Sequence, residues 1–124
     1  MRILLDTHTL LWWLGNDRRL PDAIGTAVND GTNEILVSSI SVAEISIKAS
    51  LGKLQAPDDL LAQLRAASMI SLPFTNDHAI ALRQLPLHHR DPFDRMLVVQ
   101  ALTESLVFAT VDPRCRQYAV QTLS

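Results

Sequence analysis

Four acidic residues stand at positions from which their carboxylates could share a metal ion. Asp6 and Asp112 each follow a short apolar run of the kind that forms a buried strand, while Glu44 and Asp94 lie in apolar helical segments. An ionised acid on a buried helix is costly unless it is paired or binds a cation, so Glu44 and Asp94 point to a site. Ligands that are all oxygen favour Mg²⁺ or Mn²⁺ over zinc.

Converging carboxylates would repel one another. Two unit charges separated by roughly 4 Å cost about 4 kcal/mol at an effective dielectric constant of 20. A divalent cation removes this cost, lowers the pKa of a coordinated water and stabilises charge on a phosphate. The four acids therefore predict hydrolysis of a phosphodiester bond by a metal-activated water.

Each of these acids also has a purely structural interpretation. Asp6 could cap the helix that follows it, and Asp112, which precedes a proline, has the pattern of a helix start. Glu44 could form an ion pair with Lys48, four residues along the same helix. The sequence leaves these alternatives open.

A second carboxylate lies three residues before Asp94. Asp91 precedes Pro92 at a helix start, so we interpret Asp91 as the N-cap and prefer Asp94 as the metal ligand. Asp91 could still reach a second metal ion or its water. The structural alternative for Asp94 is an ion pair with Arg90 or Arg95.

The other polar residues are assigned supporting or passive roles. The hydroxyls of Thr7 and Thr110 could bond a neighbouring carboxylate or a metal-bound water, although strand-end capping would explain them equally well. The histidines share no metal-ligand spacing, and we interpret His88 and His89 as a solvated loop. The single cysteine, Cys115, excludes an internal disulfide and a thiolate metal site.

The elements that position these acids alternate between strand and helix. Continuous apolar runs predict strands buried on both faces of a parallel sheet, at Ile3–Leu5, Ile35–Val37, Met69–Leu72, Leu106–Ala109 and, more weakly, Ala119–Leu123. The intervening segments are long enough for right-handed helical crossovers. The sequence therefore predicts an α/β fold, a three-layer α/β/α sandwich with a central, mainly parallel sheet of four to five strands.

Capping residues predict where the helices begin and end. The first predicted helix starts at Pro21-Asp22 and ends near Gly31, and Ser41 precedes a second that runs through Leu51 and stops at Gly52. The later boundaries are a start at Pro57–Asp59, a cap at Thr75 or Asn76 with an end near Arg83, and a start at Asp91-Pro92. Because ligands bind beyond the carboxyl ends of parallel strands, we expect the acids to meet at that edge.

Composition limits the class of protein. A chain of 124 residues that is 48% hydrophobic and 19% charged suits one domain, residues 1–124, and is not a disordered chain. The net charge of −2 excludes general nucleic-acid binding by counterion release alone. No apolar run approaches the ~20 residues of a membrane span, and a carboxylate comes too early for a signal peptide, so we expect a cytoplasmic protein with no membrane partner.

Four segments of the chain resemble the PIN-domain ribonucleases, and among them the VapC-type toxins of bacterial type II toxin–antitoxin pairs. The segments are Ile3–His8, Ser38–Ile45, His89–Arg95 and Thr110–Asp112, and the resemblance covers essentially the full length. These proteins use an acid after the first strand, a Glu on a following helix, an Asp on a late helix and an Asp after the fourth strand. The resemblance thus implies a catalytic and metal-binding set that consists of Asp6, Glu44, Asp94 and Asp112.

The same resemblance implies an endoribonuclease that depends on Mg²⁺ or Mn²⁺ and acts as a toxin. Its expected partners are an RNA substrate, a cognate antitoxin protein and a second copy of the chain in a homodimer. Cleavage is expected to leave a 3′-hydroxyl and a 5′-phosphate. Arg90 and Arg95 are weaker candidates for contacts to RNA phosphate, and Thr7, Thr110 and Asp91 are candidates for supporting or additional positions.

Two other classes of protein are alternatives to this one. A response-regulator receiver domain needs a phosphoacceptor Asp after a middle strand and a Lys after the last strand, but Ser38 and Ser39 follow the second predicted strand and the only lysines are Lys48 and Lys53. A non-catalytic RNA- or protein-binding module would pair the carboxylates with some of the nine arginines. Such a saturated network would bind no metal, so calorimetry with Mg²⁺ or Mn²⁺ separates it from a nuclease.

Overall fold

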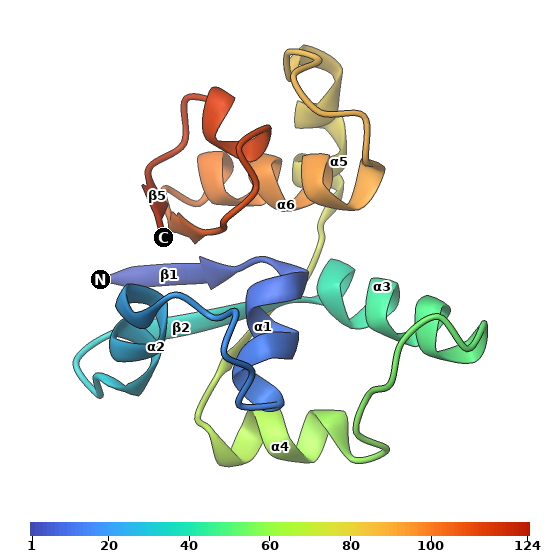
Figure 1. The fold of residues 1–124 in the computed structure, drawn as a ribbon. Helices are drawn as coiled ribbons and strands as arrows, with labels where there is room; N and C mark the ends of the chain where they lie inside the picture. The colour runs from blue at the N-terminus through green and yellow to red at the C-terminus, as the bar shows by residue number, and fades with distance from the viewer.

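Five parallel strands form the centre of the fold in the computed structural model, which describes residues 1–124 (Figure 1). The strands pair in the order β3-β2-β1-β4-β5 within one sheet. They are β1 (Arg2–Leu5), β2 (Glu34–Ser38), β3 (Ile70–Leu72), β4 (Val107–Ala109) and β5 (Thr122–Leu123). The predicted parallel sheet is confirmed, and its weakest candidate strand is the short β5.

Six helices connect or follow the strands. They are α1 (Thr7–Leu14), α2 (Asp22–Asn29), α3 (Ser39–Ser50), α4 (Leu60–Ala66), α5 (Asn76–Ala81) and α6 (Pro92–Thr103), with short 3-10 turns η1 (Leu82–Gln84) and η2 (Cys115–Gln117). The chain moves outward from β1 to β3 and then returns to the other side of β1 for β4 and β5. The order therefore reverses between β1 and β4, and ligand crevices form at such a switch point in open α/β sheets.

Alternate side chains of each strand enter two separate apolar layers. Ile3 and Leu5 of β1 pack in a core with residues of α1, α2, α3 and α4. Leu4 packs on the other face with Phe108 of β4 and with buried residues of α6. Figure 1 shows α1, α2 and α4 on one side of the sheet and α5 and α6 on the other, so the predicted three-layer arrangement is confirmed. None of the helices is long and apolar enough to cross a membrane.

Helix α3 begins earlier than predicted. The cap is Ser38, whose hydroxyl accepts the backbone N–H of Ile40 at 3.0 Å, and the predicted cap Ser41 lies one turn inside the helix. The reason is that β2 runs directly into α3, so that Ser38 serves as both the last strand residue and the cap. The predicted end at Gly52 is confirmed, because Gly52 takes the left-handed conformation with φ +70° just after the helix.

The predicted cap of α6 is also confirmed. The Asp91 side chain accepts the backbone N–H groups of Phe93 and Asp94, and Pro92 occupies the first helical position, where a missing N–H costs nothing. Residues 97–101 of this helix are buried, as its apolar sequence predicts. The capped end of α6 is thereby held at the carboxyl edge of the sheet, close to β4.

Candidate metal centre

The switch point between β1 and β4 places two of the predicted acids together. Asp6 follows β1 directly, and its backbone N–H donates to the carbonyl oxygen of Ala109 at 3.1 Å, which extends the pairing of β1 with β4. Asp112 lies three residues beyond β4, and its backbone N–H donates to the Thr110 hydroxyl at 3.1 Å. Asp6 and Thr110 are both buried, so this edge of the sheet holds polar groups away from solvent.

Glu44 reaches the same region from the middle of α3. It is buried, and its Oε2 accepts from the Lys48 ammonium one turn further along the helix, so the predicted ion pair forms. Its Oε1 is buried with no hydrogen-bond partner. A buried carboxylate oxygen without a partner is costly, so the ion pair with Lys48 satisfies only one of the two carboxylate oxygens of Glu44.

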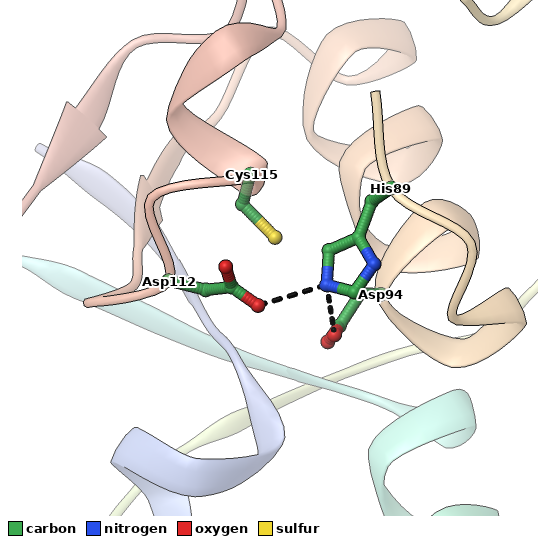
Figure 2. A group of neighbouring side chains, drawn as sticks. All are labelled: His89, Asp94, Asp112 and Cys115. Carbon is green, nitrogen blue, oxygen red and sulfur yellow. Dashed lines mark hydrogen bonds and ion pairs between the residues drawn. The ribbon is translucent and has the colours of Figure 1, made fainter. Parts of the chain in front are cut away.

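Asp94 and Asp112 meet at a residue that we expected in solvent. His89 is 5% exposed, and its Nε2 lies 3.0 Å from Asp94 Oδ2 and 2.8 Å from Asp112 Oδ2 (Figure 2). One ligand atom each from these three residues and from Cys115 lie within 4.8 Å of one another. The interpretation of His88 and His89 as a solvated loop is thus wrong for His89, while His88 is exposed.

No local pattern in the sequence revealed His89. It precedes the capped start of α6 and is 23 residues from Asp112, so their contact depends on how the loop before α6 folds back over the end of β4. The one available clue is that His89 stands two residues before a helix cap and five before Asp94. At that distance its ring can turn back toward the first turn of the helix.

The electrostatics of the cluster reflect crowded negative charge. Burial and the charges of Asp91, Asp6 and Glu44 together raise the pKa of Asp94 to about 7, although the charge of His89 opposes the rise. Burial also raises the pKa of Asp6, although hydrogen bonds from Thr110 and Thr9 oppose the rise. The protein without a cation therefore keeps a proton near Asp94 at pH values where a free carboxyl has lost it.

Asp112 is shifted in the opposite direction. Burial tends to raise its pKa, but hydrogen bonds from the Arg114 backbone and the His89 ring outweigh that tendency and hold the pKa below its usual value. The Arg114 N–H donates to Asp112 Oδ1 at 2.8 Å, which leaves Oδ2 facing His89. Asp112 is therefore the ionised member of the adjacent Asp94 and Asp112 pair.

Cys115 belongs to the core rather than to the ligand set. Its side chain is fully buried in the apolar layer beneath α6. Burial raises the pKa of its thiol, and the nearby charges of Asp94, Asp112 and Asp6 raise it further. A thiol kept protonated is neither a nucleophile nor a ligand for a hard cation, in agreement with the passive role assigned from the sequence.

The residues present fit a hard divalent cation. Asp94 and Asp112 offer adjacent carboxylate oxygens, Glu44 offers a buried oxygen without a partner, and Asp6 acts electrostatically on Asp94. Lys48 is the one fully charged basic group paired with any of these acids. Excess negative charge built from oxygen ligands matches Mg²⁺ or Mn²⁺ better than a thiophilic metal.

Two other predicted residues lie close to the acids but have structural partners. Thr7 donates from Oγ1 to the Ser41 hydroxyl at 3.1 Å and so joins α1 to α3. Asp91 is the cap of α6, where its side chain accepts the Asp94 backbone N–H, and its charge raises the pKa of the Asp94 carboxyl. The predicted alternative, an arginine on Asp94, is wrong, because Asp94 pairs with His89.

The two arginines predicted to contact RNA phosphate differ in whether their side chains already have partners within the chain. The Arg95 guanidinium donates to the carbonyl oxygens of Leu85 and Pro86 and to the Tyr118 hydroxyl at 3.2 Å. These bonds hold the loop before α6 and do not favour a role in binding RNA phosphate. Arg90 is exposed and forms no side-chain hydrogen bond or ion pair within the chain.

A basic groove of about 770 Å³ begins at Glu44. The Trp12 ring lies along it, with the Arg19 guanidinium 5.4 Å from the ring centre. The lining carries a small excess of positive charge, because its charged residues are Arg19, Lys48, Lys53, Glu44 and Asp17. Arg19 pairs with Asp17 and Lys48 pairs with Glu44, which leaves Lys53 as the lining cation without an ion pair.

Comparison with known proteins gives a consistent result. A family model described as "PIN domain" matches residues 3–121. Ribonuclease VapC22 of Mycobacterium tuberculosis (strain ATCC 25618 / H37Rv) is 28% identical over 119 residues, which cover 94% of this chain and 91% of that protein.

Two solved structures share the fold. DNA-bound VapBC from Salmonella typhimurium matches with a TM-score of 0.73 and 22% identity, over 99% of this chain and 97% of that chain. VapBC2 from Rickettsia felis, bound to a DNA fragment from its promoter, matches with a TM-score of 0.67 and 14% identity, over 99% of this chain and 98% of that chain. At these identities the structures support the fold, while the family match covers the acids.

Proposed function

This chain belongs to the PIN-domain family, and we propose that it is an endoribonuclease dependent on Mg²⁺ or Mn²⁺. The observation that carries the proposal is the approach of Asp94 and Asp112 to within 4.8 Å at the switch point of the sheet, with the unpartnered oxygen of Glu44 on the neighbouring helix. Like charges assembled in this way are stable only when a cation or protons neutralise them. Similarity to a VapC ribonuclease favours RNA as the substrate.

We assign metal ligation and catalysis to Asp6, Glu44, Asp94 and Asp112. A bound Mg²⁺ or Mn²⁺ would lower the pKa of a coordinated water and stabilise the charge that develops on the phosphate. Lys48 holds one oxygen of Glu44 and leaves the other available. Thr110 bonds the backbone of Asp112 and opposes the raised pKa of Asp6, which suits a hydroxyl that orients both carboxylates.

The basic groove supplies a path for the RNA backbone. Lys53 and Arg19 line it beyond Glu44, and phosphate contacts of this kind position a nucleic acid without reading its sequence. Trp12 offers an aromatic surface in the same groove, where an unpaired base could stack. We propose that single-stranded RNA enters along this groove and that exposed Arg90 contacts phosphate from the side of α6.

The relatives suggest the biological setting. VapC22 is a ribonuclease and the similar structures are VapBC assemblies. We propose that this chain likewise acts as the toxin of a toxin–antitoxin pair, as a homodimer in the cytoplasm, and that a cognate antitoxin protein neutralises it. Expression without the antitoxin should then arrest growth, and the variant Asp94→Asn should not.

The competing interpretation as a non-catalytic binding module requires acids that are paired with arginines, and this pairing is not observed in the acidic cluster. Its carboxylates would have to be paired with arginines, but the ion pairs of the cluster involve Lys48 and His89. The arginine ion pairs of the chain are Arg2 with Glu34 and Arg19 with Asp17. Both lie outside the acidic cluster, so the carboxylates keep their capacity to bind a cation.

The first experiment is cleavage of total bacterial RNA by the purified protein. We expect discrete products with Mn²⁺, none with EDTA, and none from Asp94→Asn, because the substitution removes one ligand and one negative charge. Asp58→Asn serves as the matched control, since this exposed acid lies in the turn before α4. Cleavage by Asp94→Asn at the wild-type rate, or equal cleavage in EDTA, would contradict the proposal.

A further inference from the structure

His89 is the buried polar residue that links the acids although it is not an acid itself. It comes from the loop before α6, and its Nε2 contacts Asp94 of that helix at 3.0 Å and Asp112, beyond β4, at 2.8 Å. Figure 2 shows one ring nitrogen facing both carboxylates, with both dashed contacts ending on it. One ring atom therefore connects carboxylates from two separate elements.

The hydrogen bond at Nδ1, the other ring nitrogen of His89, shows which ring nitrogen carries the proton. The backbone N–H of Asp91 donates to His89 Nδ1 at 3.1 Å. A nitrogen that accepts a hydrogen bond has no proton of its own, so the neutral ring carries its proton on Nε2. This Nε2–H donates to Asp112 Oδ2 at 2.8 Å, and Asp94 Oδ2 lies 3.0 Å from the same nitrogen. A nitrogen in this state has no lone pair to offer a metal ion.

The backbone around His89 is also held in place. Its N–H donates to the Tyr118 hydroxyl at 3.0 Å, and Arg95 of α6 donates to the same hydroxyl at 3.2 Å. Tyr118 is buried, and Arg95 also binds the carbonyl oxygen of Pro86 at 2.9 Å. The imidazole thus sits on a loop that is tied to α6 and to the C-terminal segment.

We propose that His89 is a positioning residue whose Nε2–H holds the carboxylates of Asp94 and Asp112 in the arrangement that receives a hard divalent cation. The inference rests on the proposed metal-dependent function of the same site. Partners that orient metal ligands typically change metal affinity roughly 10- to 100-fold when they are removed. His89 acts through Asp94 and Asp112 and does not itself bind the cation.

The test is calorimetric titration of the full-length protein with Mn²⁺. We expect His89→Ala to weaken Mn²⁺ binding roughly 10- to 100-fold, and His89→Gln, whose amide N–H can take the place of Nε2–H, to recover part of the loss. His88→Ala is the matched control for metal affinity, because His88 is the exposed neighbour in the same loop. Unchanged or tighter Mn²⁺ binding by folded His89→Ala would overturn the inference.

A milder variant covers the case in which His89→Ala does not fold. Tyr118→Phe removes only the hydroxyl that accepts the His89 N–H, and it should weaken Mn²⁺ binding in the same direction by a smaller factor. Wild-type Mn²⁺ affinity in a folded Tyr118→Phe variant would count against the positioning role.

Nitrogen NMR of the histidine ring gives a second readout. We expect Nε2 of His89 to be protonated and Nδ1 to be bare, both without metal and after addition of Mg²⁺. Loss of the Nε2 proton when Mg²⁺ binds would make His89 a ligand and overturn the inference.

The Mn²⁺ affinity of Asp94→Asn distinguishes failure of the inference about His89 from failure of the proposed metal-dependent function. If Asp94→Asn loses Mn²⁺ affinity and His89→Ala does not, the metal centre stands and the role of His89 is refuted. If Asp94→Asn also keeps full Mn²⁺ affinity, the metal centre is refuted, and the proposal for His89 falls with it.

Discussion

At the scale of single residues, structural and catalytic interpretations of an acid prove compatible. Asp6 caps α1 by accepting the Thr9 N–H at 2.8 Å, yet it also lies at the switch point and acts on Asp94. Glu44 pairs with Lys48 through one oxygen and keeps the other without a partner. A carboxylate has two oxygens and several lone pairs, so one cap or ion pair does not exhaust it.

Asp94 should make the metal-free protein less stable as the pH rises. Its pKa of about 7 in the folded state exceeds the ordinary aspartate value of 3.8, so the folded protein binds more protons than the unfolded chain between those values. The stability that protonated Asp94 contributes is complete below the lower value and is lost as the pH rises through about 7. Thermal unfolding in EDTA measures this loss.

The variant Asp94→Asn should abolish that pH dependence. At about pH 8 in EDTA we expect its Tm to exceed the wild-type value by about 4 °C, equivalent to ~1 kcal/mol, and at about pH 5 the difference should shrink. Asp58→Asn, at an exposed position, should follow the wild type at both pH values. A constant Tm difference across this range would mean that Asp94 titrates as an ordinary carboxyl.

At the scale of elements, the end of α3 controls where the lysines of the groove lie. The Gly52 N–H donates to the Ala49 carbonyl at 3.1 Å and the Lys53 N–H to the Lys48 carbonyl at 2.9 Å, the two bonds of a Schellman motif. Gly52 permits this reversal because its φ is +70°. Glu44 and Lys53 thereby lie on the helix and on the turn that closes it, and both line the groove.

Gly52→Ala should destabilise the protein through its backbone alone. A Cβ at this position would meet no atom within 4 Å, so the expected loss of about 1 kcal/mol comes from the left-handed conformation. Urea unfolding should show a lower midpoint with an unchanged slope. Gly31→Ala is the control, because it also has open space and lacks a positive φ. Equal midpoints for the two variants would contradict this explanation.

At the scale of the whole molecule, the sheet order and the distribution of charge matter more than the net charge of −2. Reversal of the strand order between β1 and β4 concentrates acids at one point. The basic groove that begins at Glu44 has three positively and two negatively charged lining residues, which is a small excess of the opposite sign. Adjacent regions of opposite charge allow a mildly acidic protein to hold both a cation and a polyanion.

Lys53→Ala should weaken RNA binding without a preference for sequence. In an Asp94→Asn background, which prevents cleavage, we expect lower affinity for single-stranded RNA and a salt dependence of binding that is shallower by about one unit. Fluorescence anisotropy at several salt concentrations measures both. Arg83→Ala, which removes one positive charge outside the groove, should change neither. An identical salt dependence for Lys53→Ala and the wild type would exclude this groove as the path of the RNA.

The sequence by itself determined the alternation of strands and helices and most of the caps, and it singled out the four candidate acids. These features depend on local patterns, because apolar runs form buried strands and short polar side chains cap the helix that follows. Asp91 and Gly52 were identified in this way, whereas the start of α3 was misplaced where β2 runs into it without a loop. The family resemblance then implied that these acids form one catalytic and metal-binding set.

Only the tertiary structure decided which side chains face one another at the edge of the sheet. His89 lies 23 residues from Asp112, and their contact depends on how the loop before α6 folds back over the end of β4. The same folding commits Arg95 to backbone carbonyls and buries Cys115 as a thiol. Such long-range contacts have no local signature, because a histidine, arginine or cysteine gains its role from neighbours that the packing of the sheet supplies.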